Sequence, residues 1–245
     1  MSSTGELLTY PPPRDMSCPF DPPPAVLEIA RSDRPIRRVQ IWDGTQAWLV
    51  TRYTDARAVL ADDRFSADPS SPGFPEKSAA YAATVGQDKN LRTLDNPEHD
   101  RQKRMVIRDF TVKRVEDIRP KVQEYVDGLI NDMITKGASA NIVTDLAFPV
   151  PTMVICELLG VPYVDRTYFG ERSNTCLSRE ASPEEAAQAG KDLYEYLDQL
   201  IDRKSAEPTD DLLSRLVTEQ LATGSLTRKQ VVEMGRIMLI AGHET

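Results

Sequence analysis

Apolar residues recur at three- and four-residue steps along most of the chain from residue 97 onward, and this spacing predicts amphipathic helices. One such stripe over residues 112–137 consists of Val115, Ile118, Val122, Val126, Leu129 and Met133. Gly137 can end that helix, because glycine tolerates the backbone angles found after a helix C-terminus. The segment "PVPTMVICELLG" predicts an apolar helix that Gly160 ends. The pattern therefore predicts a mainly α-helical protein.

Three further helix starts carry capping signals. In "DNPEH", Asn96 suits the N-cap and Pro97 the first helical position, so a helix is expected to begin at Pro97. "SPEE" from Ser182 begins another long helix. Thr227 and Gln230 have the spacing of a capping box for the last helix, which runs to the end of the chain.

Before residue 97 the pattern changes. Residues 1–24 hold seven of the eighteen prolines, which predicts an extended arm. "RRVQIWDGTQAWLVTRY" alternates apolar and polar residues on both sides of Asp43-Gly44, a dipeptide suited to the positive φ angles of a tight hairpin turn, so two short strands are expected. A helix follows over "TDARAVLADD". Residues 65–90 are rich in Pro, Ser and Gly and are typical of a binding loop or lid.

Composition indicates a globular protein with a real core. The chain has 245 residues, of which 40% are hydrophobic and 28% charged. No window approaches the roughly 18 apolar residues that cross a bilayer, and the N-terminus lacks the layout of a secretion signal, so the cytoplasm is the expected location and no membrane partner is expected. Cys18, Cys156 and Cys176 are widely spaced, which predicts three reduced thiols and no zinc site.

Charge narrows the choice of partners. A net charge of −8 argues against binding of nucleic acid, which requires a basic surface. Residues 100–119 are an exception, with seven basic residues against four acidic ones. This stretch is either a solvated helix face or a docking patch for an acidic protein, and composition leaves both interpretations open.

Candidate chemistry gathers at two places. The last apolar run ends in Ala241-Gly242-His243-Glu244-Thr245, where the small pair either admits a flat or bulky ligand or allows close helix packing. Burial of a carboxylate such as that of Glu244 costs free energy, so a buried Glu244 is expected to be paired or hydrogen-bonded, or to have a functional role. His99 and Lys103 are four residues apart on one helix face, where they either clamp an anionic group or lie as ordinary surface residues.

These segments resemble one family. "LDNPEHDRQKRMVIRDFTVKRV" is similar to the C-helix region of soluble bacterial cytochrome P-450 proteins, the haem-thiolate monooxygenases, and "AGHET" is similar to the oxygen-activation motif of their central I helix. "PRDMSCPFDPPP", "IWDGTQAWLVTRYTDARAVLADDRFSAD" and "AFPVPTMVICELLGVP" also fit, in the expected order. The resemblance covers nearly the whole chain and implies the N-terminal portion of the cytochrome P-450 fold, mainly α with a small β element.

The resemblance implies a haem b cofactor with a thiolate ligand. His99 and Lys103 would hold its propionates, although the family commonly has arginine at the second position, and lysine lacks arginine's two-pronged donor. Ala241 and Gly242 would form the groove for dioxygen beside the iron. Glu244 and Thr245 match the acid and alcohol that supply protons for oxygen activation.

The function implied is hydroxylation of a moderately large apolar molecule, such as a macrolide, terpenoid, sterol-like compound or xenobiotic. Leu91, Ile237 and Ile240 would line the substrate pocket. Electrons would come from NAD(P)H through ferredoxin reductase and ferredoxin. The residues expected to dock ferredoxin on a monomeric enzyme are Arg101, Arg104, Arg108 and Lys113.

The family's haem-ligating cysteine lies downstream of its I helix, in a loop that no cysteine of this chain resembles. The metal ligand is therefore unknown, and residues 1–245 are expected to be the N-terminal part of a single cytochrome P-450 domain, with residues 1–24 as its arm. Two alternatives remain open. One is a nitric-oxide-reductase-like relative, against which Glu244 argues. The other is a non-enzymatic helical binding module, should the chain truly end at Thr245.

Overall fold

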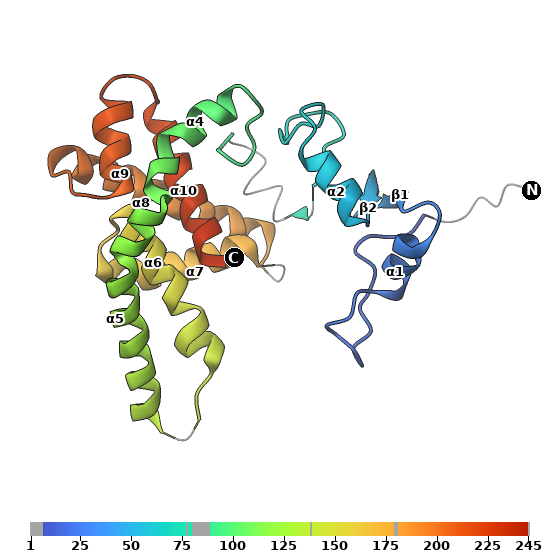
Figure 1. The fold of residues 1–245 in the computed structure, drawn as a ribbon, viewed down its shortest axis with the longest axis horizontal. Coiled ribbons are helices and arrows are strands. Elements are labelled where there is room, and N and C mark those ends of the chain that lie inside the picture. Colours follow the sequence, from blue (N-terminus) through green and yellow to red (C-terminus); the bar gives the residue numbers. More distant parts are fainter. Residues whose placement is uncertain (1–6, 77, 80–88, 138, 179–180, 245) are drawn as a thin grey trace, which may run out of the picture.

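The computed structural model describes residues 7–76, 78–79, 89–137, 139–178 and 181–244. Figure 1 shows two parts: a small N-terminal part and, from residue 98 onward, a larger body of helices that we call the helical body. The mainly α-helical architecture with a small β element confirms the sequence prediction.

The N-terminal part contains one antiparallel hairpin between two short helices. In chain order its elements are α1 (Pro24–Arg31), β1 (Ile36–Gln40), β2 (Gln46–Val50) and α2 (Tyr53–Leu60). The strand register pairs Ile36 with Val50 and Gln40 with Gln46. Residues 8–10 of the arm pair with the end of β1: the Tyr10 amide donates to the Gln40 carbonyl at 2.7 Å, and the Gln40 amide donates to the Leu8 carbonyl at 2.9 Å. The two predicted strands and the helix after them are thus confirmed.

The hairpin turn differs in detail from the prediction. Only Gly44 has a positive φ angle, 85°, and Asp43 does not. The loop is also longer than a two-residue turn, because the Ile41 amide closes it by donating to the Thr45 carbonyl at 2.9 Å. The Asp43 carboxylate instead accepts from the Thr45 amide, a turn that aspartate makes readily without positive φ.

The helical body consists of helices of several lengths. They are α4 (Glu98–Val106), the 3-10 helix η1 (Ile107–Phe110), α5 (Val112–Lys136), the π-helix η2 (Val143–Ala147), α6 (Pro149–Leu159), the 3-10 helix η3 (Tyr163–Asp165), α7 (Arg166–Leu177), α8 (Pro183–Ala206), α9 (Leu212–Arg215), the π-helix η4 (Leu216–Leu221) and α10 (Arg228–Glu244).

Local capping explains several of these boundaries. Ser182 and Glu185 form a complete capping box at the start of α8, which begins where the sequence predicted. Thr227 and Gln230 exchange the equivalent contacts before α10, since the Thr227 amide donates to Gln230 Oε1 at 2.8 Å. Gly160 ends α6 with a left-handed φ of 74°.

The start of α4 differs by one residue from the prediction. Pro97, not Asn96, occupies the cap position, and no side chain caps the helix. Pro97 already has helical angles but lacks an N–H, so the first turn closes through the backbone, with the His99 amide donating to the Asp95 carbonyl at 3.0 Å. The Asp95 carboxylate accepts from the Ala67 amide at 2.8 Å, which fastens the loop after α2 to the beginning of α4.

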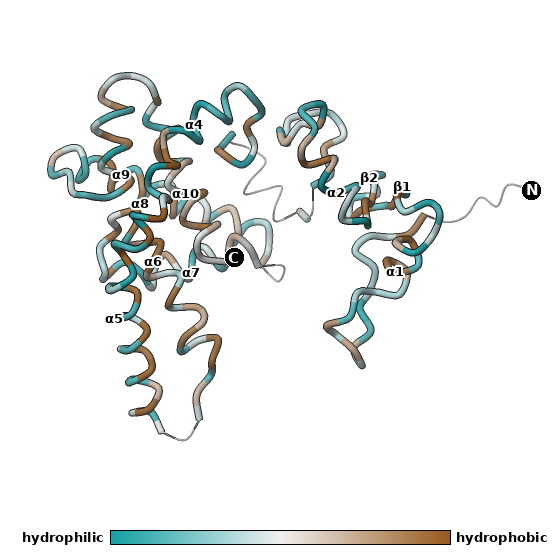
Figure 2. Tube along the Cα trace, viewed as in Figure 1, coloured by the Kyte–Doolittle hydropathy of each residue, from teal (hydrophilic) through white to brown (hydrophobic). Residues whose placement is uncertain are grey.

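The core lies where α6, α8 and α10 meet. Its buried cluster includes Ile155 and Leu159 of α6, Leu193 and Leu197 of α8, and Leu239 of α10. Figure 2 shows hydrophobic residues gathered at this junction and also along the lower half of α5. The predicted α5 stripe is only partly covered: Tyr125 is the one buried residue of that helix, and Val115 is exposed.

Within the described ranges, none of the helices combines the length and the apolar character that a bilayer crossing requires.

Candidate functional site

His99 and Lys103 lie together on one edge of α4. The helix buries Gln102 and Val106 against the body, and successive residues turn by about 100°, which puts His99 and Lys103 about 40° apart beside that buried face. The His99 side chain is 33% exposed, and its Nδ1 lies 3.4 Å from the Asp100 carboxylate. Lys103 is exposed, and no acidic residue in the described part of the chain forms an ion pair with it. Both side chains can therefore reach an anionic group.

The C-terminal half of α10 presents an apolar edge. Residues 231–236 are buried, after which Ile237 and Ile240 become half-buried and Ala241 exposed. These three residues have i, i+3, i+4 spacing and share one helix face, whereas Leu239 points into the core. An uncovered apolar face in a core helix can hold a flat or bulky apolar ligand.

Gly242 lies on a different side of α10 from Ala241. A Cβ atom built on Gly242 would come within 2.8 Å of the Ile155 side chain on α6. Close packing of α10 against α6 therefore requires glycine here. Close helix packing was one of the two interpretations open for the Ala-Gly pair, and Gly242 has that role, whereas the family resemblance implied that Ala241 and Gly242 share one groove. Contact of the Gly242 backbone with a cofactor remains a prediction.

Three predicted site residues have limited structural support. The Glu244 backbone continues α10, but its side chain lies outside the described residues, as does Thr245 entirely. Leu91 lies before α4, where it is half-buried and packs on the core cluster. A proton-delivery role for Glu244 and Thr245, and a substrate contact for Leu91, stay predictions.

The basic stretch from Arg101 to Arg119 is largely neutralised within the chain. Arg101 binds both oxygens of Glu98, with Nε at 2.7 Å and Nη2 at 2.6 Å. Arg108 pairs with Glu219 on η4 at 2.6 Å. The other internal pairs are Arg114–Asp210 and Arg119–Glu116. Of the four residues predicted to dock a partner, Arg101 and Arg108 thus have acidic partners of their own.

Glu98 has a role that the sequence analysis missed. Its carboxylate also accepts from Gln102 Nε2 at 2.8 Å, and its bonds to Arg101 and Gln102 hold the pKa of Glu98 down to about 2. Arg101 and Gln102 follow Glu98 by three and four residues, and this spacing in a helix could have predicted their contacts with Glu98. Arg101 in turn donates from Nη1 to the Ser225 carbonyl at 2.9 Å, so this group fastens α4 to the segment before α10.

The cysteines are free thiols, as predicted. Burial raises the pKa of Cys156 to about 12 and that of Cys176 to about 11. Metal ligation requires the thiolate, which these two apolar surroundings disfavour. Neither residue suits the role of a haem ligand.

A separate open groove of about 660 Å³ runs between α5, α6 and α7. Leu129, Phe148, Met153, Tyr163 and Arg166 are among its lining residues. None of the residues that the sequence analysis assigned to the site lines this groove, so it is distinct from the edges of α4 and α10.

Known proteins share this arrangement over nearly all of the chain. Cytochrome P450-SU2 from Streptomyces griseolus is 47% identical over 240 residues, which cover 98% of this chain and 58% of the relative. The chain belongs to the cytochrome P450 family. A vitamin D3 dihydroxylase from Streptomyces griseolus is 40% identical to this P450 chain over 95% of its length and 57% of the relative's.

The fold of this P450 chain agrees with solved structures. The mycinamicin VIII C21 methyl hydroxylase MycCI from Micromonospora griseorubida, bound to mycinamicin VIII, superposes with a TM-score of 0.86 at 38% identity. That match covers 98% of this chain and 60% of MycCI. The chain thus spans somewhat more than half the length of the relatives it matches. No family model matches it.

Proposed function

We propose that the protein is a haem-thiolate monooxygenase and that residues 1–245 form the N-terminal part of its single P450 domain. The observation that carries this proposal is the apolar edge of Ile237, Ile240 and Ala241, which is partly uncovered although the preceding residues 231–236 of α10 are buried. Haem is flat and largely apolar with two carboxylates at one edge. The apolar face of α10 and the basic edge of α4 offer the two kinds of contact that it needs.

Bound haem with a thiolate ligand would supply oxygen activation and cleavage of the O–O bond. The chain's own residues would position it. The imidazole of His99 and the ammonium of Lys103 would bind the propionates, Lys103 as a point charge rather than a two-pronged donor. Ala241 leaves room on α10 because it carries only a methyl group. No cysteine of this chain is assigned as the iron ligand: burial keeps Cys156 and Cys176 protonated, and the segment around Cys18 does not resemble the family's ligand loop.

Proton delivery is the proposed task of the last two residues. Cleavage of the O–O bond requires two protons, and the apolar surroundings of Ile237 and Ile240 offer none. Glu244 would pass protons inward from water, and the Thr245 hydroxyl would donate to the reacting oxygen and be reprotonated in turn. Glu244 also favours this reaction over nitric-oxide reduction, in which no such acid precedes the threonine.

Substitution of Thr245 tests this role. In the full-length haem protein, Thr245→Ala is expected to keep the haem but lower the fraction of consumed NAD(P)H that appears as product, because protons then arrive at the wrong oxygen or too late. The measurement is product formed per NAD(P)H consumed, alongside peroxide release. Undiminished coupling would contradict the proposed role, and a reduced, carbon-monoxide-treated protein without a thiolate-type Soret band would contradict the haem-thiolate assignment.

The proposed substrate is a moderately large apolar molecule. Two relatives support this size and chemistry by their names, one a vitamin D3 dihydroxylase and one a hydroxylase solved with mycinamicin VIII. Leu91, Ile237 and Ile240 are the proposed contacts. A screen of macrolides, terpenoids, sterols and xenobiotics for shifts in the haem absorption spectrum tests the proposal, and it fails if only small polar molecules bind.

A further inference from the structure

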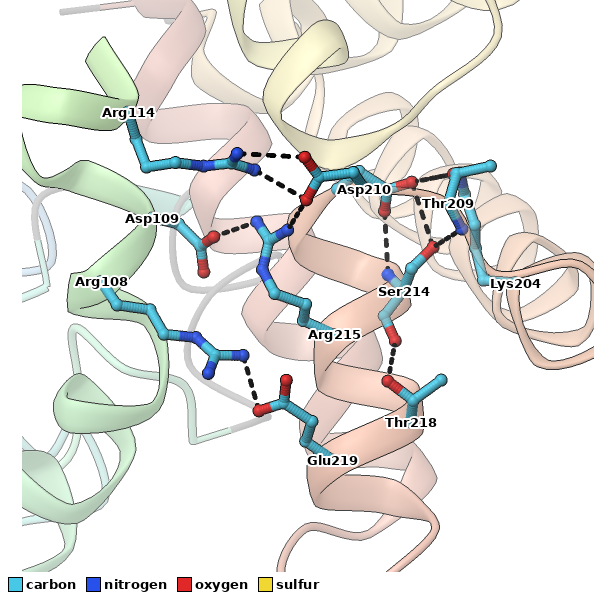
Figure 3. A network of polar contacts seen from close by, with 11 residues as sticks. Arg108, Asp109, Arg114, Lys204, Thr209, Asp210, Ser214, Arg215, Thr218 and Glu219 are labelled. Carbon is cyan, nitrogen blue, oxygen red and sulfur yellow. Dashed lines mark hydrogen bonds and ion pairs between the residues drawn. The ribbon is translucent and has the colours of Figure 1, made fainter. Parts of the chain in front are cut away.

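A charged network joins the end of α4 to the helices before α10. Figure 3 shows it: Arg108 of η1 pairs with Glu219 of η4 at 2.6 Å, and Arg114 at the start of α5 binds both oxygens of Asp210 at 3.0 and 3.1 Å. The connection spans about a hundred residues of sequence. It therefore fixes two distant segments against each other.

Arg215 and Asp109 lie at the centre of this network. Arg215 donates from Nη2 to the Asp109 carboxylate and from Nη1 to Asp210 at 2.7 Å (Figure 3). Asp109 is only 3% exposed, and the Arg215 side chain 19%. A buried carboxylate is costly without its cation, so loss of the Arg215 guanidinium would force Asp109 and the η1 turn that carries it to move.

The position of Asp109 connects the network to His99 and Lys103. Asp109 lies in η1, which continues α4 directly, three residues beyond the buried Val106. The N-terminal half of α4 is held by Arg101, whose guanidinium donates to the Ser225 carbonyl. One contact near each end of the α4–η1 segment thus fixes its rotation, and with it the direction in which the His99–Lys103 edge faces.

We propose that Arg215 is a positioning residue for the haem-propionate contacts of His99 and Lys103. This inference rests on the proposed function. Arg215 contacts neither residue; it acts by holding the buried Asp109, which fixes the C-terminal end of the helix that carries them. Without it, α4 can turn or shift, and both contacts loosen together.

The test measures haem loss from the full-length haem protein to excess apomyoglobin, below the temperature at which any variant unfolds. Arg215→Met is expected to raise the rate of haem loss by about tenfold, a typical coupling for groups that act through one another. Arg215→Lys keeps a positive charge beside the Asp109 carboxylate, but a lysine cannot also reach Asp210. This variant should therefore lose haem faster than wild type but more slowly than Arg215→Met. Asp109→Asn is a milder change that should also raise the rate of haem loss, and it replaces Arg215→Met in the test if that variant folds poorly.

A mutant cycle separates positioning from general loosening. In a background that carries both His99→Ala and Lys103→Ala, Arg215→Met should raise the rate of haem loss by less than about twofold, because both of its target contacts are already gone. Arg166→Met is the matched control: Arg166 is 8% exposed and joins α7 to Tyr125 of α5 and Glu157 of α6, with no contact to α4 among the described residues. It should lower the melting temperature without changing the rate of haem loss.

Two results would overturn the proposal: an Arg215→Met effect that persists at full size in the background that lacks both His99 and Lys103, or an Arg166→Met variant that loses haem equally fast. Unchanged haem retention in Arg215→Met and in Asp109→Asn would also overturn it, while leaving the monooxygenase function intact. A wild-type protein that binds no haem would instead contradict both the positioning role of Arg215 and the proposed monooxygenase function.

Discussion

Gly160 shows how a single residue without a side chain preserves a buried ion pair. Its φ is 74°, and a Cβ at this position would lie 2.2 Å from the Asp211 carboxylate and 2.5 Å from Lys204 Nζ. Lys204 and Asp211 pair at 2.6 Å with side chains 10% and 5% exposed. Glycine is thus required both by the backbone angle at the end of α6 and by the space that the ion pair occupies.

Gly160→Ala is therefore expected to lower the free energy of unfolding by about 3–5 kcal/mol, the cost of displacing one partner of a buried pair. Gly224 provides the matched control, because its φ is 72° and no atom lies within 4 Å of the Cβ that alanine would add. Gly224→Ala should lower it by about 1–2 kcal/mol, the backbone contribution alone. Urea unfolding measures both, and equal losses would contradict the role of the ion pair.

The thiols are expected to differ sharply in reactivity. Cys18 is exposed, whereas burial raises the pKa of Cys156 to about 12 and that of Cys176 to about 11. With iodoacetamide at pH 8, Cys18 should be alkylated more than about a hundredfold faster, because the other two are inaccessible and almost free of thiolate. Peptide mass spectrometry reads the sites. Similar alkylation rates for the three cysteines in the native protein would show that the helical body opens readily. In urea, where the protein is unfolded, the three rates should become equal.

Among the elements, α4 depends on ionised Glu98. Its bonds to Arg101 and Gln102 lower the pKa of Glu98 from 4.5 to about 2. A carboxyl group whose pKa is lower in the folded state stabilises that state above its unfolded pKa and loses the contribution as pH falls. The stabilisation from Glu98 is therefore complete above about pH 5 and disappears between pH 4.5 and 2. Solvent screening keeps it small, because the side chain is partly exposed.

Glu98→Gln is expected to lower the free energy of unfolding at pH 7 and to have progressively less effect as the pH approaches 2. Urea unfolding of both proteins across pH 2.5–7 measures the difference. Glu116→Gln serves as the control, because Glu116 pairs with Arg119 of the same helix, α5, and both side chains are exposed. If Glu98→Gln lowers the free energy of unfolding equally at every pH, the loss comes from altered packing or hydrogen-bond geometry and not from the charge of Glu98.

At the scale of the whole molecule, internal ion pairs decide which basic residues are available to a partner. The protein carries a net charge of −8, and Arg101, Arg108, Arg114 and Arg119 are paired within the chain. In the described part of the chain, no acidic residue pairs with Arg104 or with Lys113. We propose these two as ferredoxin contacts, because an acidic partner gains most from charges that are not already neutralised.

Arg104→Glu and Lys113→Glu should each raise KM for an acidic ferredoxin about threefold to tenfold at low salt, with a smaller change in kcat, because charges at the rim of an interface act mainly on association. Lys191→Glu on α8 is the matched control: Lys191 is an exposed lysine with a neighbouring acid on its own helix. Steady-state kinetics over a ferredoxin titration measures the effect. An equal rise in KM for Lys191→Glu would indicate net charge rather than a docking site.

The sequence by itself determined the hairpin, the helices α2, α4, α5, α6, α8 and α10, and several of their ends, but it did not predict α1, α7 or α9. Apolar spacing, capping residues and glycines such as Gly137 and Gly160 act within a few residues, so they can be read without knowing the neighbours. Its errors were equally local: Pro97 rather than Asn96 caps α4, and only Gly44 of the turn has positive φ. The family resemblance was also present in the sequence, because the segments that carry it are continuous stretches of chain.

Only the tertiary structure decided what those residues contact. Gly242 lies against Ile155 of α6, while the neighbouring Ala241 is turned by about 100° to another side of α10, so the packing residue depends on which helix lies on which side of α10. Asp109 meets Arg215, 106 residues away, and Arg108 meets Glu219. Pairs so distant in sequence leave no periodic signal, because their distance is set by the packing of several helices at once rather than by the backbone between them.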